Sequence, residues 1–187
     1  PYALSMFSCH RLRVFFVSSH MSLVDACGYA TKERVLEFVE NIDKELRKTG
    51  IMEPLIAVAA LNPHGGDNGL FGTEEIEQLI PAVEAARAEG INAVGPVPAD
   101  SVFHIGKSGK YDAILSLYHD QGHIACKTLD FEKSVTLTFG LPFIRSSVDH
   151  GTAFDIAGKG IAGSISLIES TRVVAEYAAL MHKKTDQ

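Results

Sequence analysis

The sequence predicts an α/β fold in which a mostly parallel sheet is flanked by helices. From Arg13 onward, short runs of β-branched or aromatic residues alternate with longer segments in which apolar residues recur every three to four positions. Residues 1–187 are too few for two full-sized domains, but they are enough to bury a sizeable core. We therefore expect a single α/β unit.

The first expected strand is Val14–Ser18, and the first expected helix is Thr31–Lys48. Along that helix, apolar residues recur at three-to-four spacing with charges between them, at Val35, Leu36, Val39, Ile42 and Leu46. Gly50 is expected to end it. The continuous apolar run Leu55–Leu61 is typical of a strand buried on both faces.

The segment Asn62–Gly72 contains too many glycine, proline and asparagine residues to be regular structure. Thr73 is then expected to cap a helix that runs to about Glu89. Glu74 and Glu75 would lie favourably at the positive N-terminal end of that helix.

Three further strands are expected, at Ile91–Val94, Ala113–Leu117 and Ser134–Phe139. The first two lead into the polar segments Gly95–Asp100 and Tyr118–Gly122. Ser164–Met181 is expected to be a closing helix, and residues 182–187 a frayed tail.

Composition argues against several classes of protein. A formal net charge of -6 and a pI near 5.7 do not favour a nucleic-acid surface, which is normally basic. Cys9, Cys27 and Cys126 show no CxxC spacing, so neither a disulfide framework nor a thiolate zinc site is indicated, and a reducing cytoplasm is the expected location. The apolar runs are far shorter than the ~20 residues of a membrane-spanning helix, and no signal-peptide pattern is found at the N-terminus.

Three histidines, His20, His64 and His119, each come just after an expected strand. Parallel α/β folds place ligands at the carboxyl ends of their strands. Imidazole suits Zn²⁺, Co²⁺ or similar ions, and three such ligands leave coordination positions open for substrate oxygens. The ordinary alternative for each histidine by itself is a loop or capping role, and the spacing does not decide between the two.

Two acidic residues and one lysine are further candidates for chemistry. Asp100 and Asp120 are expected in strand-end loops, as partners of metal ligands, general bases or further ligands. The alternative is that Asp100 caps the segment Ser101–Ile105 and that Asp120 caps the turn after His119. If Asp120 opens a helix, Lys127 lies about two turns on, where it would donate to a hydroxyl or phosphate, or else be a surface lysine.

The segment Gly140–Gly151 mixes apolar residues with Arg145, whose guanidinium fork suits a phosphate or carboxylate. A salt bridge from Arg145 to Asp149 is the simpler alternative. The glycine-rich segment Asp149–Ile161 allows close backbone approach to a ligand, but it is not a GxGxxG motif after a first strand. A standard Rossmann nucleotide site is therefore not supported.

Five motifs occur in an order and at separations that resemble those of the 4-hydroxythreonine-4-phosphate dehydrogenase (PdxA) family. They are Leu61–Gly66, Gly72–Ile76, Gly95–Asp100, Tyr118–Gly122 and Gly140–Gly151. The resemblance runs from about Leu12 to Ala179, and Asp149–Ile161 is also similar to the segment by which isocitrate and isopropylmalate dehydrogenases hold their nucleotide. It implies an isopropylmalate-dehydrogenase-like fold. It also implies that residues 1–187 are the C-terminal portion of a two-domain dehydrogenase, with the N-terminal portion absent.

The resemblance also implies a set of site residues. One divalent cation (Zn, Mg or Co) would be bound by His20, His64 and His119, with the third histidine reaching across from the neighbouring subunit of a homodimer. Catalytic roles would belong to Lys127, Asp100 and Asp120, and contacts with a phosphorylated substrate to Lys127, Thr136 and Arg145. NAD would be held by His150, Gly151, Asp155 and Gly158.

The implied chemistry is oxidation of a secondary alcohol β to a carboxylate, with hydride transfer to NAD and subsequent loss of CO₂. At Thr136 the family member acting in vitamin B6 synthesis usually has asparagine. The stretch His123–Phe131 is more similar to paralogues that act on 4-phosphorylated threonate or erythronate. We therefore favour a sugar-acid phosphate as substrate. Lys159 does not decide between NAD and NADP.

Two other functions fit the same residues. A metal-dependent aldolase or hydrolase could use three histidines and a lysine, but it would not need the nucleotide-like segment, so NAD binding discriminates. A folded oligomerisation and metal-binding module would bind metal without oxidising any substrate. A generic α/β domain with scattered histidines predicts that replacing His64 leaves metal affinity unchanged.

Overall fold

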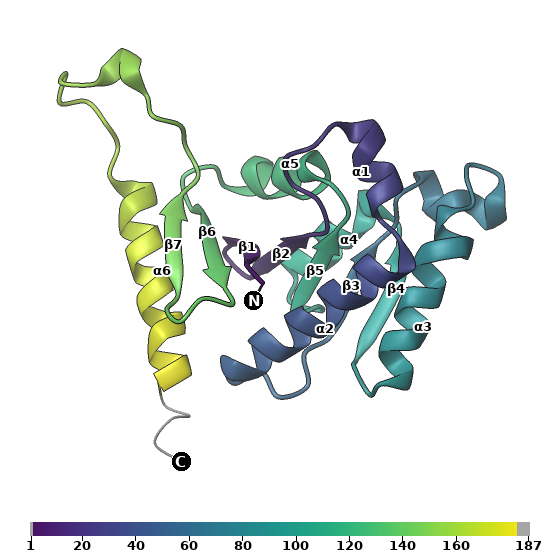
Figure 1. Ribbon diagram of the computed structural model, residues 1–187. Coiled ribbons are helices and arrows are strands. Elements are labelled where there is room, and N and C mark those ends of the chain that lie inside the picture. Colours follow the sequence, from purple (N-terminus) through teal and green to yellow (C-terminus); the bar gives the residue numbers. More distant parts are fainter. Residues whose placement is uncertain (1, 183–187) are drawn as a thin grey trace.

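A computed structural model describes residues 2–182 and shows one mixed sheet with helices on both faces (Figure 1). The strands are β1 (Leu4–Cys9), β2 (Leu12–Phe16), β3 (Ile56–Ala59), β4 (Ala93–Val97), β5 (Ala113–Ser116), β6 (Ser134–Phe139) and β7 (Arg145–Val148). The helices are α1 (Leu23–Tyr29), α2 (Lys32–Lys48), α3 (Ile80–Ala88), α4 (Ala99–Lys107), α5 (His119–Leu129) and α6 (Ile165–His182). Short helical turns lie at Pro63–Gly69, Glu75–Leu79 and Phe154–Ile156.

The sheet has a parallel half and an antiparallel half. Its strand order is β4-β3-β5-β2-β1-β6-β7, and the pairs from β4 to β2 are parallel while those from β2 to β7 are antiparallel. The α/β class is confirmed, but parallel pairing covers less of the sheet than "mostly parallel" implies. The reason is that β1 joins β2, and β6 joins β7, through connections too short for a helical crossover.

Helix α2 forms where the sequence predicts it. Thr31 is its N-cap, and the Thr31 hydroxyl accepts a hydrogen bond from the backbone N–H of Arg34 at 3.4 Å. The expected apolar stripe faces the sheet, with Val35, Val39, Ile42 and Leu46 fully buried. The chain leaves the helix through Gly50, whose φ of +95° is costly for other residues.

The helix expected from Thr73 to about Glu89 is present, but its start differs from the expectation. The Thr73 carbonyl accepts from the N–H of Glu77 at 2.8 Å, whereas the Thr73 side chain caps nothing. Residues Glu75–Leu79 form a π-helical turn before α3. Pro81 has no N–H to donate and its ring crowds the preceding turn, which explains why the α-helical pattern starts only at Ile80.

Several boundaries moved and some elements were missed. β4 continues through Pro96. Proline lacks a backbone N–H, and an edge strand such as β4 tolerates this because one side of it has no partner strand. The strands β1 and β7 and the helix α1 were not predicted. The closing helix was placed within one residue at each end, while residues 183–187 of the expected tail lie outside the described residues.

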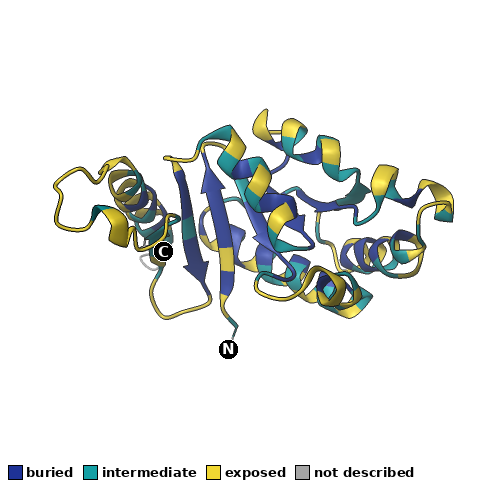
Figure 2. Ribbon diagram, turned by 90° about the horizontal axis from the view of Figure 1, so that it is seen from above, coloured by how far each residue is buried: buried dark blue, intermediate teal, exposed yellow. Residues whose placement is uncertain are grey.

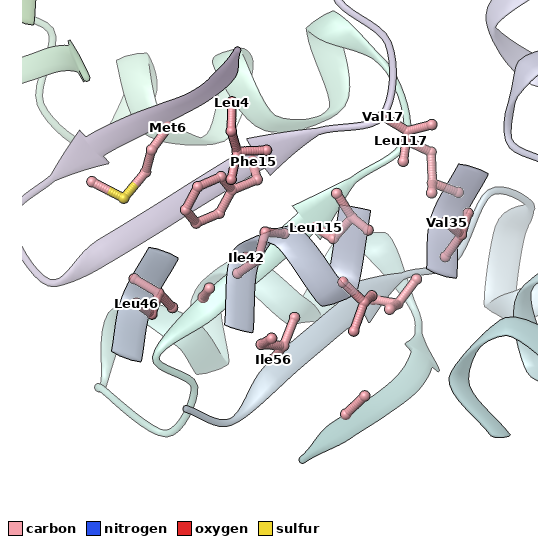
Figure 3. Packing of buried hydrophobic residues seen from close by; sticks show 14 of the residues in the cluster. Leu4, Met6, Phe15, Val17, Val35, Ile42, Leu46, Ile56, Leu115 and Leu117 are labelled. Atoms are coloured by element: carbon pink, nitrogen blue, oxygen red, sulfur yellow. The ribbon is translucent and has the colours of Figure 1, made fainter. Parts of the chain in front are cut away.

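Two apolar clusters fill the two faces of the sheet. Side chains of α2, α3 and α6 cover one face, where Phe15, Leu115 and Ile42 pack together (Figure 3). Side chains of α4 and α5 cover the other face, over Phe7, Phe16 and neighbouring residues. Figure 2 shows the buried strands between helices whose outer faces are exposed. Within the described residues, no helix is long and apolar enough to cross a membrane.

Candidate active site

His20 and His119 are brought together by the parallel pairing of β2 with β5. The two strands end side by side, and beyond their last pair the N–H of Val17 still donates to the carbonyl of Ser116 at 2.9 Å. The chain then turns away from both strand ends, and the ring centroids of His20 and His119 lie 5.9 Å apart. These two imidazoles therefore lie next to each other at the carboxyl edge of the sheet, where the sequence predicted them.

Helix α5 begins at His119 and presents one functional face. His119, His123 and Lys127 are four residues apart, so their side chains lie on the same side of the helix. Gly122 lies on the side that faces the sheet, where an added Cβ would come within 2.6 Å of the Phe16 ring. The missing side chain lets α5 lie close against β2.

Asp120 contacts His119 directly. Its Oδ1 lies 2.6 Å from Nδ1 of His119, while Nε2 of that imidazole has no hydrogen-bond partner among the described residues. A carboxylate on one imidazole nitrogen is the usual way in which proteins orient a metal-binding histidine. The alternative that Asp120 caps the helix is not what the structure shows, because α5 has no side-chain cap.

His123 was not recognised as a site residue from the sequence. Its ring stacks on that of His119, with centroids 3.8 Å apart and planes 12° from parallel, and on that of Phe16 at 4.4 Å and 28°. Its Nδ1 lies 2.9 Å from the carbonyl oxygen of His119. Burial lowers the pKa of His123 below its ordinary value, because the charged form loses solvation. Its four-residue spacing from both His119 and Lys127 was the available signal.

Lys127 is paired with Asp149. The Lys127 Nζ lies 2.6 Å from Oδ2 of Asp149, a largely buried carboxylate just after β7. The Lys127 ammonium also lies 5.6 Å from the centroid of the Phe131 ring. The simpler expectation, a salt bridge between Arg145 and Asp149, is therefore wrong, because Lys127 occupies that carboxylate.

A cavity of about 280 Å³ unites most of these groups. Its lining residues come from β1, β2, α5, β6 and the segments after β2 and β7: Ser5, Phe7, Phe16, Ser19, His20, His119, His123, Lys127, Thr136 and Asp149. Thr136 thus lies in the same cavity as Lys127. Arg145 does not line it: Arg145 is exposed on β7, paired in register with Thr138, and its side chain has no ion pair with any described residue.

The glycine-rich segment forms a second, more open hollow of about 700 Å³. It belongs to the long excursion between β7 and α6, which projects from the body of the molecule (Figure 1). Of the residues expected to hold NAD, His150, Gly151 and Gly158 line this hollow, whereas Asp155 does not. Phe131 lines it too, so the Phe131 side chain connects this hollow with Lys127.

His64 begins a run of left-handed backbone. Residues 64–68 all have positive φ, and His64, Asp67 and Asn68 adopt this conformation without being glycine. The buried carboxylate of Glu75 supports the start of this loop by accepting the N–H groups of Leu61 and Asn62 at 2.8 and 2.7 Å.

The His64 ring lies near Phe71, with centroids 6.4 Å apart. Among the described residues, no three His, Cys, Asp or Glu side chains are grouped so that they could hold a metal ion. His20 and His119 are therefore adjacent, and His64 of the same chain does not complete a triad with them.

Asp100 is exposed in the first turn of α4, beyond the end of β4. It does not cap Ser101–Ile105 as the simpler alternative held, because α4 starts at Ala99 with Pro98 as N-cap. Of the two acidic residues singled out from the sequence, only Asp120 contacts a histidine of the site.

The family model for "Pyridoxal phosphate biosynthetic protein PdxA" matches residues 1–174. The chain belongs to the PdxA family. A PdxA relative from Halalkalibacterium halodurans, named provisionally as a D-threonate 4-phosphate dehydrogenase, is 58% identical over 175 residues, which are 94% of this chain and 52% of the relative. The chain thus spans about half the length of the curated relatives it matches.

Solved structures agree with PdxA membership. A crystal structure of 4-hydroxythreonine-4-phosphate dehydrogenase from Klebsiella pneumoniae is 43% identical, with a TM-score of 0.87 over 95% of this chain and 54% of that one. A β-decarboxylating dehydrogenase from Thermococcus kodakarensis, 21% identical, matches with a TM-score of 0.54 over 80% of this chain and 43% of that one. The second likeness concerns the fold, and it agrees with the expected isopropylmalate-dehydrogenase-like architecture.

Proposed function

We propose that the protein containing this chain oxidises a 4-phosphorylated hydroxy acid at its secondary alcohol, using NAD and a divalent cation, and that the resulting 3-oxo acid loses CO₂. The observation that carries this proposal is the cavity in which two adjacent histidines face a lysine beside a glycine-rich hollow. PdxA membership supports it, because the named relatives are dehydrogenases of such acids.

The residues present fit a divalent cation in part. His20 and His119 would supply two ligands, with Asp120 orienting His119. His64 would supply the third ligand from a second copy of the chain, because it does not join the pair within one chain. We therefore propose a homodimer with a shared active site. When bound, the cation (Zn, Mg or Co) would polarise the alcohol oxygen and NAD would accept the hydride.

The chain's own groups would bind and orient the acid. Lys127 would place its ammonium against the alcohol oxygen as that oxygen gives up its proton, and Asp149 would hold the lysine there. Asp120 is the first candidate to accept the proton and Asp100 the second. Thr136 would contact the same substrate, and the guanidinium of Arg145, which has no ion pair with a described residue, would bind its phosphate.

The glycine-rich hollow is the proposed NAD site. His150, Gly151 and Gly158 would approach the dinucleotide with their backbone, and Asp155 would have to turn toward it to take part. Because Phe131 lines this hollow and also contacts Lys127, the two sites are adjacent. Adjacency is required if a hydride is to pass directly from the acid to NAD.

The substrate we favour is 4-phosphothreonate, with 4-phosphoerythronate and 4-hydroxythreonine 4-phosphate as alternatives. The relative from Halalkalibacterium halodurans carries the threonate name, and Thr136 offers a hydroxyl in the cavity. The reaction would belong to carbohydrate metabolism, or to pyridoxine biosynthesis if the amino acid is preferred, and would take place in the cytoplasm. We propose that this chain is the C-terminal portion of a two-domain dehydrogenase.

The test is NADH formation by the full-length protein with each of the three acids, after chelation and with or without added Zn²⁺, Mg²⁺ or Co²⁺. We expect metal-dependent turnover that is lost in His119→Ala and kept in His104→Ala, whose side chain is exposed on α4. Metal binding without turnover would instead indicate a binding module. Consumption of the acid without NADH formation would indicate an aldolase or hydrolase.

A further inference from the structure

The imidazole of His123 is held on three sides. Near-parallel rings lie at 3.8 Å (His119) and 4.4 Å (Phe16), and two such close rings must occupy opposite faces. The Phe7 ring adds a tilted contact at 4.6 Å. With both faces covered, only the ring edge remains available to a ligand.

One nitrogen on that edge is already committed. Nδ1 of His123 lies 2.9 Å from the carbonyl oxygen of His119, and a carbonyl oxygen can only accept a hydrogen bond. Nδ1 must therefore carry a proton. In the neutral imidazole, Nε2 then has a lone pair and acts as an acceptor. Nε2 has no hydrogen-bond partner among the described residues, while His123 lines the cavity that holds Lys127 and Thr136.

We propose that His123 is a substrate-binding residue whose Nε2 accepts a hydrogen bond from the non-reacting hydroxyl of the hydroxy acid, next to the alcohol that is oxidised. This assignment rests on the proposed function. Lys127, one helical turn further along α5, serves the reacting oxygen, so His123 is one turn from it and meets the neighbouring oxygen. The site thereby selects an acid that carries a hydroxyl at that carbon over one that carries only hydrogen.

The other groups that line the cavity are less suited to this role. Lys127 has only donors, and its ion pair takes Oδ2 of Asp149, a carboxylate that lines this cavity. Thr136 lines the same cavity and can donate to a substrate carboxylate or phosphate oxygen. A substrate hydroxyl needs an acceptor for its hydrogen, and an unpaired imidazole nitrogen that is held rigidly by two rings is preorganised for this bond.

The first measurement is the tautomer of His123 in this chain, read from long-range ¹⁵N–¹H spectra of the imidazoles at neutral pH. The His123→Phe variant identifies its signals, because it removes them while keeping an aromatic ring between His119 and Phe16. We expect a proton on Nδ1 and none on Nε2. A proton on Nε2 would overturn the assignment, since that nitrogen would then be a donor.

The second measurement uses the full-length protein with 4-phosphothreonate and with its 2-deoxy analogue, 3-hydroxy-4-phosphobutanoate. In His123→Phe, we expect the ratio of the two kcat/KM values to fall by about 10- to 100-fold, mostly through KM for the hydroxylated acid. The control His104→Phe, on the exposed side of α4, is expected to keep the wild-type ratio. An equal loss for both acids would show that the ring only packs and would overturn the substrate contact.

The two proposals fail in different ways. If the wild type oxidises neither of these acids, nor 4-phosphoerythronate nor 4-hydroxythreonine 4-phosphate, the proposed function fails and the substrate contact fails with it. If the wild type oxidises both acids but His123→Phe keeps the ratio, only the assignment of His123 is overturned.

Discussion

Replacing Glu75 with alanine should cost far more stability than replacing its exposed neighbour Glu77. The Glu75 carboxylate is 1% exposed and accepts the N–H groups of Leu61 and Asn62 at 2.8 and 2.7 Å. A second carboxylate oxygen accepts from the Asn62 side-chain amide at 2.9 Å. Glu75→Ala would leave two backbone donors without an acceptor, at about 1–3 kcal/mol each. We expect a loss of about 2–5 kcal/mol in the free energy of unfolding.

The assay is urea-induced unfolding of the 187-residue chain, followed by far-ultraviolet circular dichroism. Glu75→Gln keeps a carbonyl oxygen for the backbone donors, so we expect it to lose only about 1–2 kcal/mol. Glu77→Ala, on the solvent side of the same turn, is expected to stay within about 0.5 kcal/mol of the wild type. If Glu75→Ala costs no more than Glu77→Ala, this carboxylate does not support the loop that carries His64.

Three further predictions concern helix α5, the ion pair between Lys127 and Asp149, and two of the cysteine thiols. Gly122→Ala should lower thermal stability by about 1–3 kcal/mol because its Cβ would meet the β2 side chains beneath α5, and a gain from helix propensity would contradict this. Asp149→Asn should lower kcat/KM about tenfold by releasing Lys127, while unfolding changes by only about 1 kcal/mol; unchanged kinetics would show that the pair is not needed. Burial raises the pKa of the Cys126 thiol, so that group stays protonated even at about pH 9 and should react with Ellman's reagent only after unfolding, whereas half-buried Cys27 should react in the native protein; rapid loss of both native thiols would refute this.

The sequence predicted elements whose signal is local. The stripe along α2 and its cap at Thr31 need only neighbouring residues, and that helix was placed within one residue. β1 and β7 pair with their sequence neighbours β2 and β6 through short connections, and their residues show no strong alternation, so the sequence alone did not predict them as strands. The π-helical turn before α3 arises because Pro81 lacks an N–H and its ring crowds the preceding turn. Helix propensities of single residues do not predict such a turn.

The site shows the same division between local and long-range information. Strand-end position predicted that His20 and His119 would lie at one edge of the sheet, and parallel pairing then set them side by side. No spacing rule could show that Lys127 pairs with Asp149, because 22 positions of chain separate them and the contact depends on where α5 lies relative to the segment after β7. His123 was missed because its partners, Phe7 and Phe16, come from strands more than 100 positions away.

His20 and His119 follow strands β2 and β5, which backbone hydrogen bonds hold side by side. Under the proposed shared site, each chain would carry two of the three proposed ligands, and the third would arrive only with a second copy. Metal retention and self-association would then be thermodynamically linked, so that each strengthens the other. Dilution below the dissociation constant of the proposed dimer would release the ion. The protein concentration would then determine what fraction of the chains binds metal.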